Sequence, residues 1–275
     1  MDTRIAVASQ SFGARFQTLV YGHLRRALQA GESIDEVQIV RPREEDFLRM
    51  HLLTALEASP KPLALICICL RPEPETVAKY RAAGVPVVLI DEEVEGASTV
   101  SCDNRAGGYI AGTHLARSGR RSIAVVAGPD HHYNAALRLS GVTKALEEHR
   151  IALPPEAVIE APTYVRKEGE AAMARLLRER PKLDAVFSAA GDTCALGVLS
   201  VAKEAGLKVP EQLAIVGYDD IPLASISDPP LTTIRQPLDT LAREAHRLAT
   251  QCTEEILASP KQIVIEPALV VRSTG

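Results

Sequence analysis

Short apolar runs alternate along the chain with longer segments whose apolar positions recur at helical spacing. Apolar runs of four to eight residues bounded by turn residues are typical of buried strands, and a period of 3.6 residues is typical of helices. The runs predict strands over residues 5–8, 37–40, 63–70, 85–90, 122–127, 157–160, 183–188 and 213–217. The amphipathic segments predict helices over residues 16–30, 44–58, 73–83, 105–117, 135–149, 167–180, 193–205 and 238–256.

This alternation of strand and helix indicates βαβ units, a parallel sheet and right-handed crossovers. The strands fall into two groups of similar spacing, and compact domains seldom exceed about 200 residues. We therefore expect an α/β protein with two doubly wound parallel-sheet lobes. The extended segment Leu231–Ile234 and the extended tail Ile263–Val271 come late in the chain. They predict several crossings between the lobes, with a ligand cleft between them, because domain interfaces are a preferred place for ligands.

The most informative stretch runs from Leu213 to Pro237. A buried strand ends at Gly217 and is followed at once by Tyr218, Asp219 and Asp220. Ligands of open α/β sheets bind outside the carboxyl ends of the strands. Asp219 is therefore a candidate to accept hydrogen bonds from ligand hydroxyls, because carboxylates engage two neighbouring groups at once. A loop turn or a helix N-cap is the structural alternative for these two carboxylates.

Other candidate ligand-binding residues lie near the predicted ends of strands or starts of helices. Asp192 precedes a predicted helix, where an Asp is a good N-cap, and ligand contact is an additional role. Arg138 lies at a predicted helix start, with a solvated surface position as its alternative. Asp91 directly follows a predicted strand, with a structural role as a loop residue as its alternative. Phe12, Phe16 and Tyr164 lie in loops near strand ends, where aromatic rings stack on apolar ligand faces, although core packing is equally open for Phe16.

Composition narrows the class of protein. The chain is 46% hydrophobic and 24% charged, has no Trp and carries a formal charge of −4. Its basic residues are scattered, which argues against a nucleic-acid surface. Neither an uninterrupted apolar stretch of about 18 residues nor a signal-peptide pattern is present, so no membrane partner is expected. The five cysteines are an odd number without a framework, which favours reduced thiols and a cytoplasmic location.

Motifs for catalysis are missing. The sequence has no phosphate-binding loop, no nucleophile elbow and no metal-ligand spacing, and residues 107–112 do not form a dinucleotide fingerprint. We therefore expect neither an enzyme nor a metal or other cofactor.

The ordered motifs resemble the LacI/GalR family of transcriptional regulators. Residues 213–237 are similar to its GYDD…PPLTTIRQP signature. Residues 103–108, 114–115 and 119–124 resemble its DN…GG…HL…GHR.IA run, and residues 138–141 and 269–274 its R-x-x-G and its C-terminus. The resemblance implies a periplasmic-binding-protein-like fold of class I, with three crossovers and a homodimer. The implied lobes are residues 1–101 with 238–260, and 102–237 with 261–275.

By position, the resemblance implies effector contacts from Phe12, Phe16, Asp91, Asn134, Arg138, Tyr164, Asp219 and Gln236, beside Asp192. Family members often have Asn-Asp where this chain has Gly191-Asp192, and some place an aromatic at Leu238. They also carry an N-terminal helix-turn-helix, whereas this sequence begins at the first strand of the core. We therefore expect operator DNA to be a partner only through a domain that lies outside this sequence.

The resemblance implies an effector-binding and dimerisation domain that senses a small molecule, often a sugar in this family, and controls DNA binding. The alternative with the same fold is the sugar-binding protein of an ABC transporter. The missing leader, the odd cysteine count and the Val-Val-Arg-Ser-Thr tail favour the regulator. An enzyme on an α/β scaffold is a further alternative, which turnover of a sugar would reveal.

Overall fold

The computed structural model describes residues 3–9, 15–38, 45–130, 132–180, 182–251 and 253–275. The chain forms two units, one from Met1–Cys102 with Pro237–Ile265 and the other from Asp103–Gln236 with Glu266–Gly275. It passes between them three times, which confirms the expected fold class. No helix in the described ranges is long and apolar enough to cross a bilayer.

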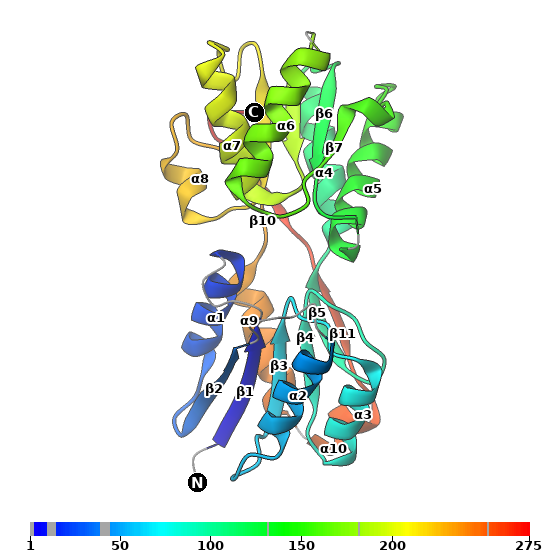
Figure 1. The fold of residues 1–275 in the computed structure, drawn as a ribbon, viewed down its shortest axis with the longest axis vertical. Coiled ribbons are helices and arrows are strands. Elements are labelled where there is room, and N and C mark those ends of the chain that lie inside the picture. The colour runs from blue at the N-terminus through cyan, green and yellow to red at the C-terminus, as the bar shows by residue number, and fades with distance from the viewer. Residues whose placement is uncertain (1–2, 10–14, 39–44, 131, 181, 252) are drawn as a thin grey trace. The chain divides into compact units, whose positions relative to one another are not determined.

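The first unit is built on a six-stranded sheet in the described part of the chain, with all neighbours parallel (Figure 1). Its strands, in spatial order, are β11 (Gln262–Ile265), β5 (Ser98–Cys102), β4 (Val87–Ile90), β3 (Ala64–Ile68), β1 (Thr3–Ser9) and β2 (Glu32–Gln38). Its helices are α1 (Arg15–Ala27), α2 (Glu45–Leu56), α3 (Pro74–Ala82), α9 (Leu238–Thr250) and α10 (Thr253–Ala258).

Alternation along the strands explains why helices cover both faces of this sheet. Ile5 and Val7 of β1 belong to one apolar cluster, together with residues of α1 and α9. Ala6 and Ala8 belong to another, with residues of α2 and α3. Successive side chains of a strand point to opposite faces, so a continuous apolar run needs cover on both sides.

The second unit repeats this plan. Its sheet contains β12 (Ala268–Val270), β10 (Thr232–Arg235), β9 (Ala214–Asp219), β8 (Ala185–Ser188), β6 (Ile123–Ala127) and β7 (Val158–Glu160), in that order. Only the β10–β12 pair of this sheet is antiparallel among the described strands. Its helices are α4 (Asn104–Arg117), α5 (Tyr133–Glu148), α6 (Arg166–Glu179), α7 (Gly191–Glu204) and α8 (Pro222–Ile226), with a 3₁₀ turn at Pro155–Ala157.

Each face of this sheet again has its own core. Ala124 and Val126 of β6 pack in a cluster with α6 and α7, whereas Ile123 and Val125 pack in a cluster with α4 and α5. Figure 1 shows α6 and α7 in front of the second sheet in this view, and α5 beside β6 and β7.

Several expected boundaries are wrong. The strand expected at residues 37–40 is β2, at Glu32–Gln38, and residues 39–40 lie outside the described part. Its sequence is mostly polar because it is an edge strand. The Ser- and Thr-rich strand β5 and the short helix α8 have no counterpart in the prediction. The helix expected over residues 238–256 is divided into α9 and α10.

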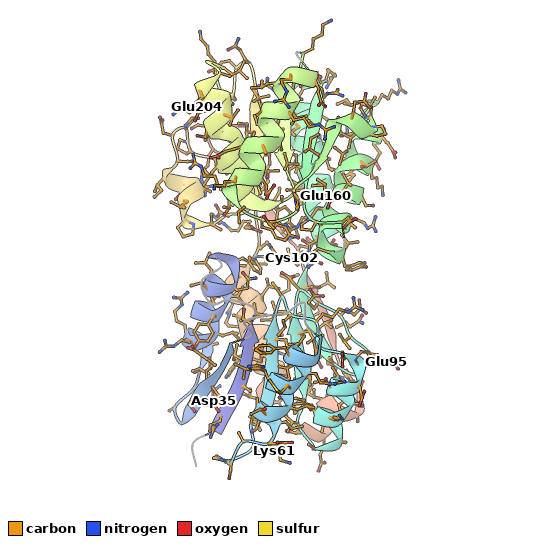
Figure 2. The ribbon with its side chains drawn as sticks, viewed as in Figure 1. Asp35, Lys61, Glu95, Cys102, Glu160 and Glu204 are labelled. Atoms are coloured by element: carbon orange, nitrogen blue, oxygen red, sulfur yellow. The ribbon has the colours of Figure 1, made fainter. Side chains whose placement is uncertain are left out.

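The C-terminal tail also differs from the expectation. Residues 261–265 were expected in the C-terminal lobe, but β11 pairs with β5 of the first sheet, where Ile263 and Ile265 pack against its core. Only residues from Glu266 onward belong to the second unit. Pro237 and Cys102, which is labelled in Figure 2, also fall in the first unit rather than the second.

Candidate functional site

The carboxyl edge of the second sheet gathers four of the predicted residues. Asp219 ends β9 and Gln236 follows β10, while Asp192 lies in the first turn of α7 after β8. Arg138 lies in α5, which follows β6. The chain reverses its direction of winding between β6 and β8, and this switch point is where open α/β sheets bind ligands.

Arg138 is fixed on three sides. Its Nε donates to Asn104 Oδ1 at 2.7 Å and its Nη1 to the Ala189 carbonyl at 3.0 Å. The guanidinium carbon lies 3.7 Å from the centroid of the Tyr218 ring, and the Tyr218 hydroxyl donates to Asn104 Oδ1 at 3.2 Å. Arg138 is only 7% exposed, so the solvated surface position considered from the sequence is wrong. A cation held over a ring face in this way is attracted by the ring quadrupole.

Asp219 occupies an unusual backbone position beside a glycine. Its φ is 108°, and its Oδ1 accepts from Gln236 Nε2 at 2.7 Å. Burial raises the pKa of its carboxyl, against the lowering effects of the Arg138 charge and of the Gln236 hydrogen bond. A Cβ added to Gly191 would lie 2.7 Å from Asp219 Oδ2, so the absence of a side chain there makes room for the carboxylate.

Asp192 is fully buried and does not cap α7. Its Oδ1 accepts from Thr233 Oγ1 at 2.6 Å and its Oδ2 from the backbone N–H of Ile221 at 2.9 Å. The expected N-cap role is therefore wrong, because Asp192 ties together the loop after β9 and strand β10. Burial raises the pKa of this carboxyl well above its ordinary value, and the negative charge of Asp219 adds to the rise.

Gln236 has one buried acceptor that is not satisfied. The residue is 3% exposed, and its Oε1 has no hydrogen-bond partner among the residues that the structure describes. Buried side-chain polar atoms nearly always have a partner, so an orphaned acceptor points to a missing donor. Asp219 and Gln236 together present acceptor atoms at the ends of two adjacent strands, which suits a ligand that carries neighbouring hydroxyl donors.

Two other predicted residues of this unit lie beyond the ends of β6 and β7. Tyr164 is 37% exposed, and its hydroxyl lies 2.8 Å from Nδ1 of His132, with the two rings stacked at a centroid distance of 5.4 Å. Asn134 is partly buried in the first turn of α5. The ring of Tyr164 also lies against Gly128, just after β6.

The remaining candidates belong to the first unit. Asp91 follows β4 with a φ of 61°, is 6% exposed, and its Oδ1 accepts from the backbone N–H of Cys102 at 3.3 Å. Its carboxylate therefore supports the loop between β4 and β5. Phe16, at the start of α1, is partly buried and packs against the apolar cluster of that face, which favours the core role. Phe12 lies outside the described residues.

The sequence did not assign roles to Asn104, Arg235 and Arg272. Asn104 accepts hydrogen bonds from both Arg138 and Tyr218. The sequence feature that could have drawn attention to it is the Asp103-Asn104 pair. Asp103 caps α4 by accepting from the backbone N–H of Ala106 at 2.8 Å. The two arginines bind Asp220, which the sequence placed at the ligand edge of the sheet with a loop turn or a helix N-cap as the alternative. No local sequence pattern signals that contact, because it joins distant segments.

The chain matches known families over most of its length. Residues 113–274, more than half of the chain, match the family model described as a periplasmic binding protein-like domain. The regulator CelR of Thermobifida fusca is 35% identical over 201 residues, which are 73% of this chain and 58% of CelR. The repressor PurR of Escherichia coli O1:K1 / APEC is 33% identical over 204 residues, 73% of this chain and 59% of PurR. The matched stretch thus covers less than three fifths of either relative.

Solved structures agree with these matches. The complex of the regulator CelR with cellobiose superposes with a TM-score of 0.83 at 29% identity, covering 100% of this chain and 85% of that one. A LacI-family transcriptional regulator from Mycobacterium smegmatis gives a TM-score of 0.81 at 26% identity, with 98% of each chain covered. The chain therefore belongs to the periplasmic binding protein-like domain family, as a relative of the LacI-family transcriptional regulators.

Proposed function

We propose that this chain is the effector-binding and dimerisation domain of a LacI-family transcriptional regulator, and that its effector is a small carbohydrate. The relatives support the regulatory role, since CelR and PurR are named as transcriptional regulators. They do not support the transporter alternative. In this proposal the protein works in the cytoplasm as a homodimer, without turnover of the effector, and reaches operator DNA through a domain outside this sequence.

The choice of a small carbohydrate as the effector rests on one observation. The carboxylate of Asp219 and the orphaned Oε1 of Gln236 present acceptors at the ends of β9 and β10, beside the guanidinium of Arg138. A carboxylate and a guanidinium side by side suit vicinal hydroxyls, which both donate and accept. The solved CelR complex contains cellobiose, which has such hydroxyl pairs.

The proposed effector contacts in the second unit are Asn134, Arg138, Tyr164, Asp192, Asp219 and Gln236, of which Asp192 acts by holding the loop beyond β9. Phe12, Phe16 and Asp91 of the first unit belong to the same proposal. The effector shifts the regulator between two states because it binds one of them more tightly, with a coupling of typically about 1–3 kcal/mol.

The proposal is tested by calorimetric titration of the chain with cellobiose, D-glucose, D-ribose and hypoxanthine. We expect a sugar to bind stoichiometrically without turnover, and to lose at least tenfold in affinity in Asp219→Asn and Arg138→Met. Glu179→Gln, on the exposed end of α6, is the control and should leave the affinity unchanged. Binding that survives both site substitutions, or consumption of the sugar, would contradict the proposal.

A further inference from the structure

The last residue of β9 and the residue after it both lie in the left-handed region. Asp219 has a φ of 108° and Asp220 a φ of 56°. Residues other than glycine avoid this region because their Cβ crowds the backbone. Such conformations persist where the surroundings fix them, and they concentrate at functional sites. Some feature of the second unit must therefore hold these two residues.

The side chain of Asp220 is firmly held, since both of its oxygens are bound by arginines. Its Oδ2 accepts from Arg235 Nε at 2.6 Å and its Oδ1 from Arg272 Nη2 at 2.5 Å. The side chains of Asp220 and Arg272 are only 9% and 16% exposed. Arg272 is itself fixed, because its Nη1 donates to the Leu231 carbonyl at 2.7 Å and its backbone N–H to Thr232 Oγ1 at 2.9 Å.

We propose that Asp220 and Arg272 are positioning residues that aim the carboxylate of Asp219 into the effector site, a role that rests on the function proposed above. The geometry is a pair of neighbouring contacts between the ends of β9 and β10. Asp220 bonds to Arg235, the last residue of β10, and Asp219 bonds to Gln236, the residue that follows it. Arg235 is the register partner of Asp219, so both contacts lie at the point where the two strands end.

A second residue of the C-terminal segment, Thr274, allows a positioning role of Arg272 to be distinguished from a purely stabilising one. Thr274, two residues after Arg272, is fully buried. Its Oγ1 accepts from Thr232 N at 2.8 Å and donates to the Ile215 carbonyl at 2.7 Å. Thr274 therefore anchors the same tail without contacting Asp220. Thr274→Val removes that anchor at constant size, and it is the matched control for any substitution of Arg272.

The first readout needs no ligand. The pKa of Asp219 is followed by ¹³C NMR of the side-chain carboxyls, with its signal identified by its loss in Asp219→Asn. We expect Arg272→Met to bring this pKa down toward the ordinary value, because a carboxylate that is no longer held turns toward water. Loss of a nearby cation alone would act in the opposite direction. Thr274→Val should keep the pKa raised, and Arg272→Lys should restore part of the effect.

The second readout is the affinity for cellobiose by calorimetric titration. We expect Arg272→Met to bind at least tenfold more weakly than the wild type, and Thr274→Val to bind within twofold of it at a comparable loss of melting temperature. If Arg272→Met gives no dispersed spectrum, Asp220→Asn takes its place, because it keeps the side-chain shape and weakens both charge-assisted bonds.

The positioning role is overturned if Arg272→Met and Thr274→Val leave the Asp219 pKa equally raised, or lower the affinity equally. Failure of the wild type to bind cellobiose, D-glucose and D-ribose would count against the proposed effector class. The NMR comparison still decides the positioning role in that case, so the two failures are distinguishable.

Discussion

Gly191 shows how a single missing side chain shapes the site. It has a φ of +87°, and a Cβ added there would lie 2.7 Å from Asp219 Oδ2. We predict that Gly191→Ala lowers the free energy of unfolding by about 2–4 kcal/mol, combining left-handed strain with a forced shift of the carboxylate. The effector affinity should fall at least tenfold. Urea unfolding and calorimetric titration measure the two effects.

Gly206, just beyond the other end of α7, is the matched control. Its φ is +75°, but a Cβ added there meets nothing within 4 Å. Gly206→Ala should therefore cost only the strain of about 1–2 kcal/mol and leave the affinity unchanged. Equal effects of the two substitutions would show that contact with Asp219 is irrelevant.

The buried carboxyl of Asp192 predicts a pH dependence of stability. Burial raises its pKa in the folded chain, so the folded state holds a proton that the unfolded state releases. Its contribution to stability is therefore lost as the pH rises from about 4, near the pKa of an unfolded Asp, through the raised folded pKa. We predict that Asp192→Asn gains stability relative to the wild type as the pH rises from 4 to 7. Urea unfolding at several pH values tests this, and a difference that does not change with pH would contradict it.

The placement of Asp219, Arg138 and Gln236 near one another could be predicted from the sequence, because they stand at or near strand ends or at positions of a recognisable motif. Their neighbours could not. Asn104 lies 34 residues from Arg138 and 114 from Tyr218, and Arg272 lies 52 residues from Asp220. Such contacts depend on which strands become neighbours, and no local pattern contains that information.

The close packing of helix α4 against helix α5 depends on glycines in both helices. A Cβ added to Gly108 would lie 2.0 Å from the Arg138 carbonyl, and one added to Gly141 would lie 2.0 Å from the Arg105 carbonyl. The two backbones therefore approach closely, and this brings Arg138 of α5 to Asn104 of α4.

We predict that Gly141→Ala lowers the free energy of unfolding by about 3 kcal/mol, because the helices must move apart. Gly22→Ala in α1 is its control, since a Cβ there meets nothing within 4 Å. That substitution should raise stability by about 0.5–1 kcal/mol through better helix propensity. Thermal unfolding compares them, and a loss in both variants would contradict the packing argument.

Elements with continuous apolar runs could be predicted, whereas those with polar sequences could not. The core strands β3, β4, β6 and β8 lie within predicted runs, because strands buried on both faces need apolar side chains throughout. Strand β9 begins within its predicted run and continues two residues beyond it, to Asp219. Strand β5, with the sequence Ser-Thr-Val-Ser-Cys, is largely buried although it is rich in hydroxyls. Tertiary context decides such a strand, and a sequence pattern cannot.

At the scale of the whole molecule, neither unit is a continuous stretch of chain. The first unit needs Pro237–Ile265, since Leu241, Ala245 and Leu248 of α9 fill the core beside α1. We predict that residues 1–236 alone give no folded first unit, whereas residues 1–102 joined directly to 237–265 do. Dispersion of amide signals in ¹H–¹⁵N spectra measures this, and a well-dispersed first unit in the shorter chain would contradict it.

The divided first unit also affects how the protein is made. Residue 237 leaves the ribosome about 135 residues after residue 102, and synthesis proceeds at about 5–20 residues per second. For roughly 7–27 seconds the nascent strands β1, β3, β4 and β5 therefore lack α9, one of the helices that cover one face of their sheet. During that interval Ile5, Val7, Ile66 and Val88 offer chaperones an apolar surface that the finished molecule no longer displays.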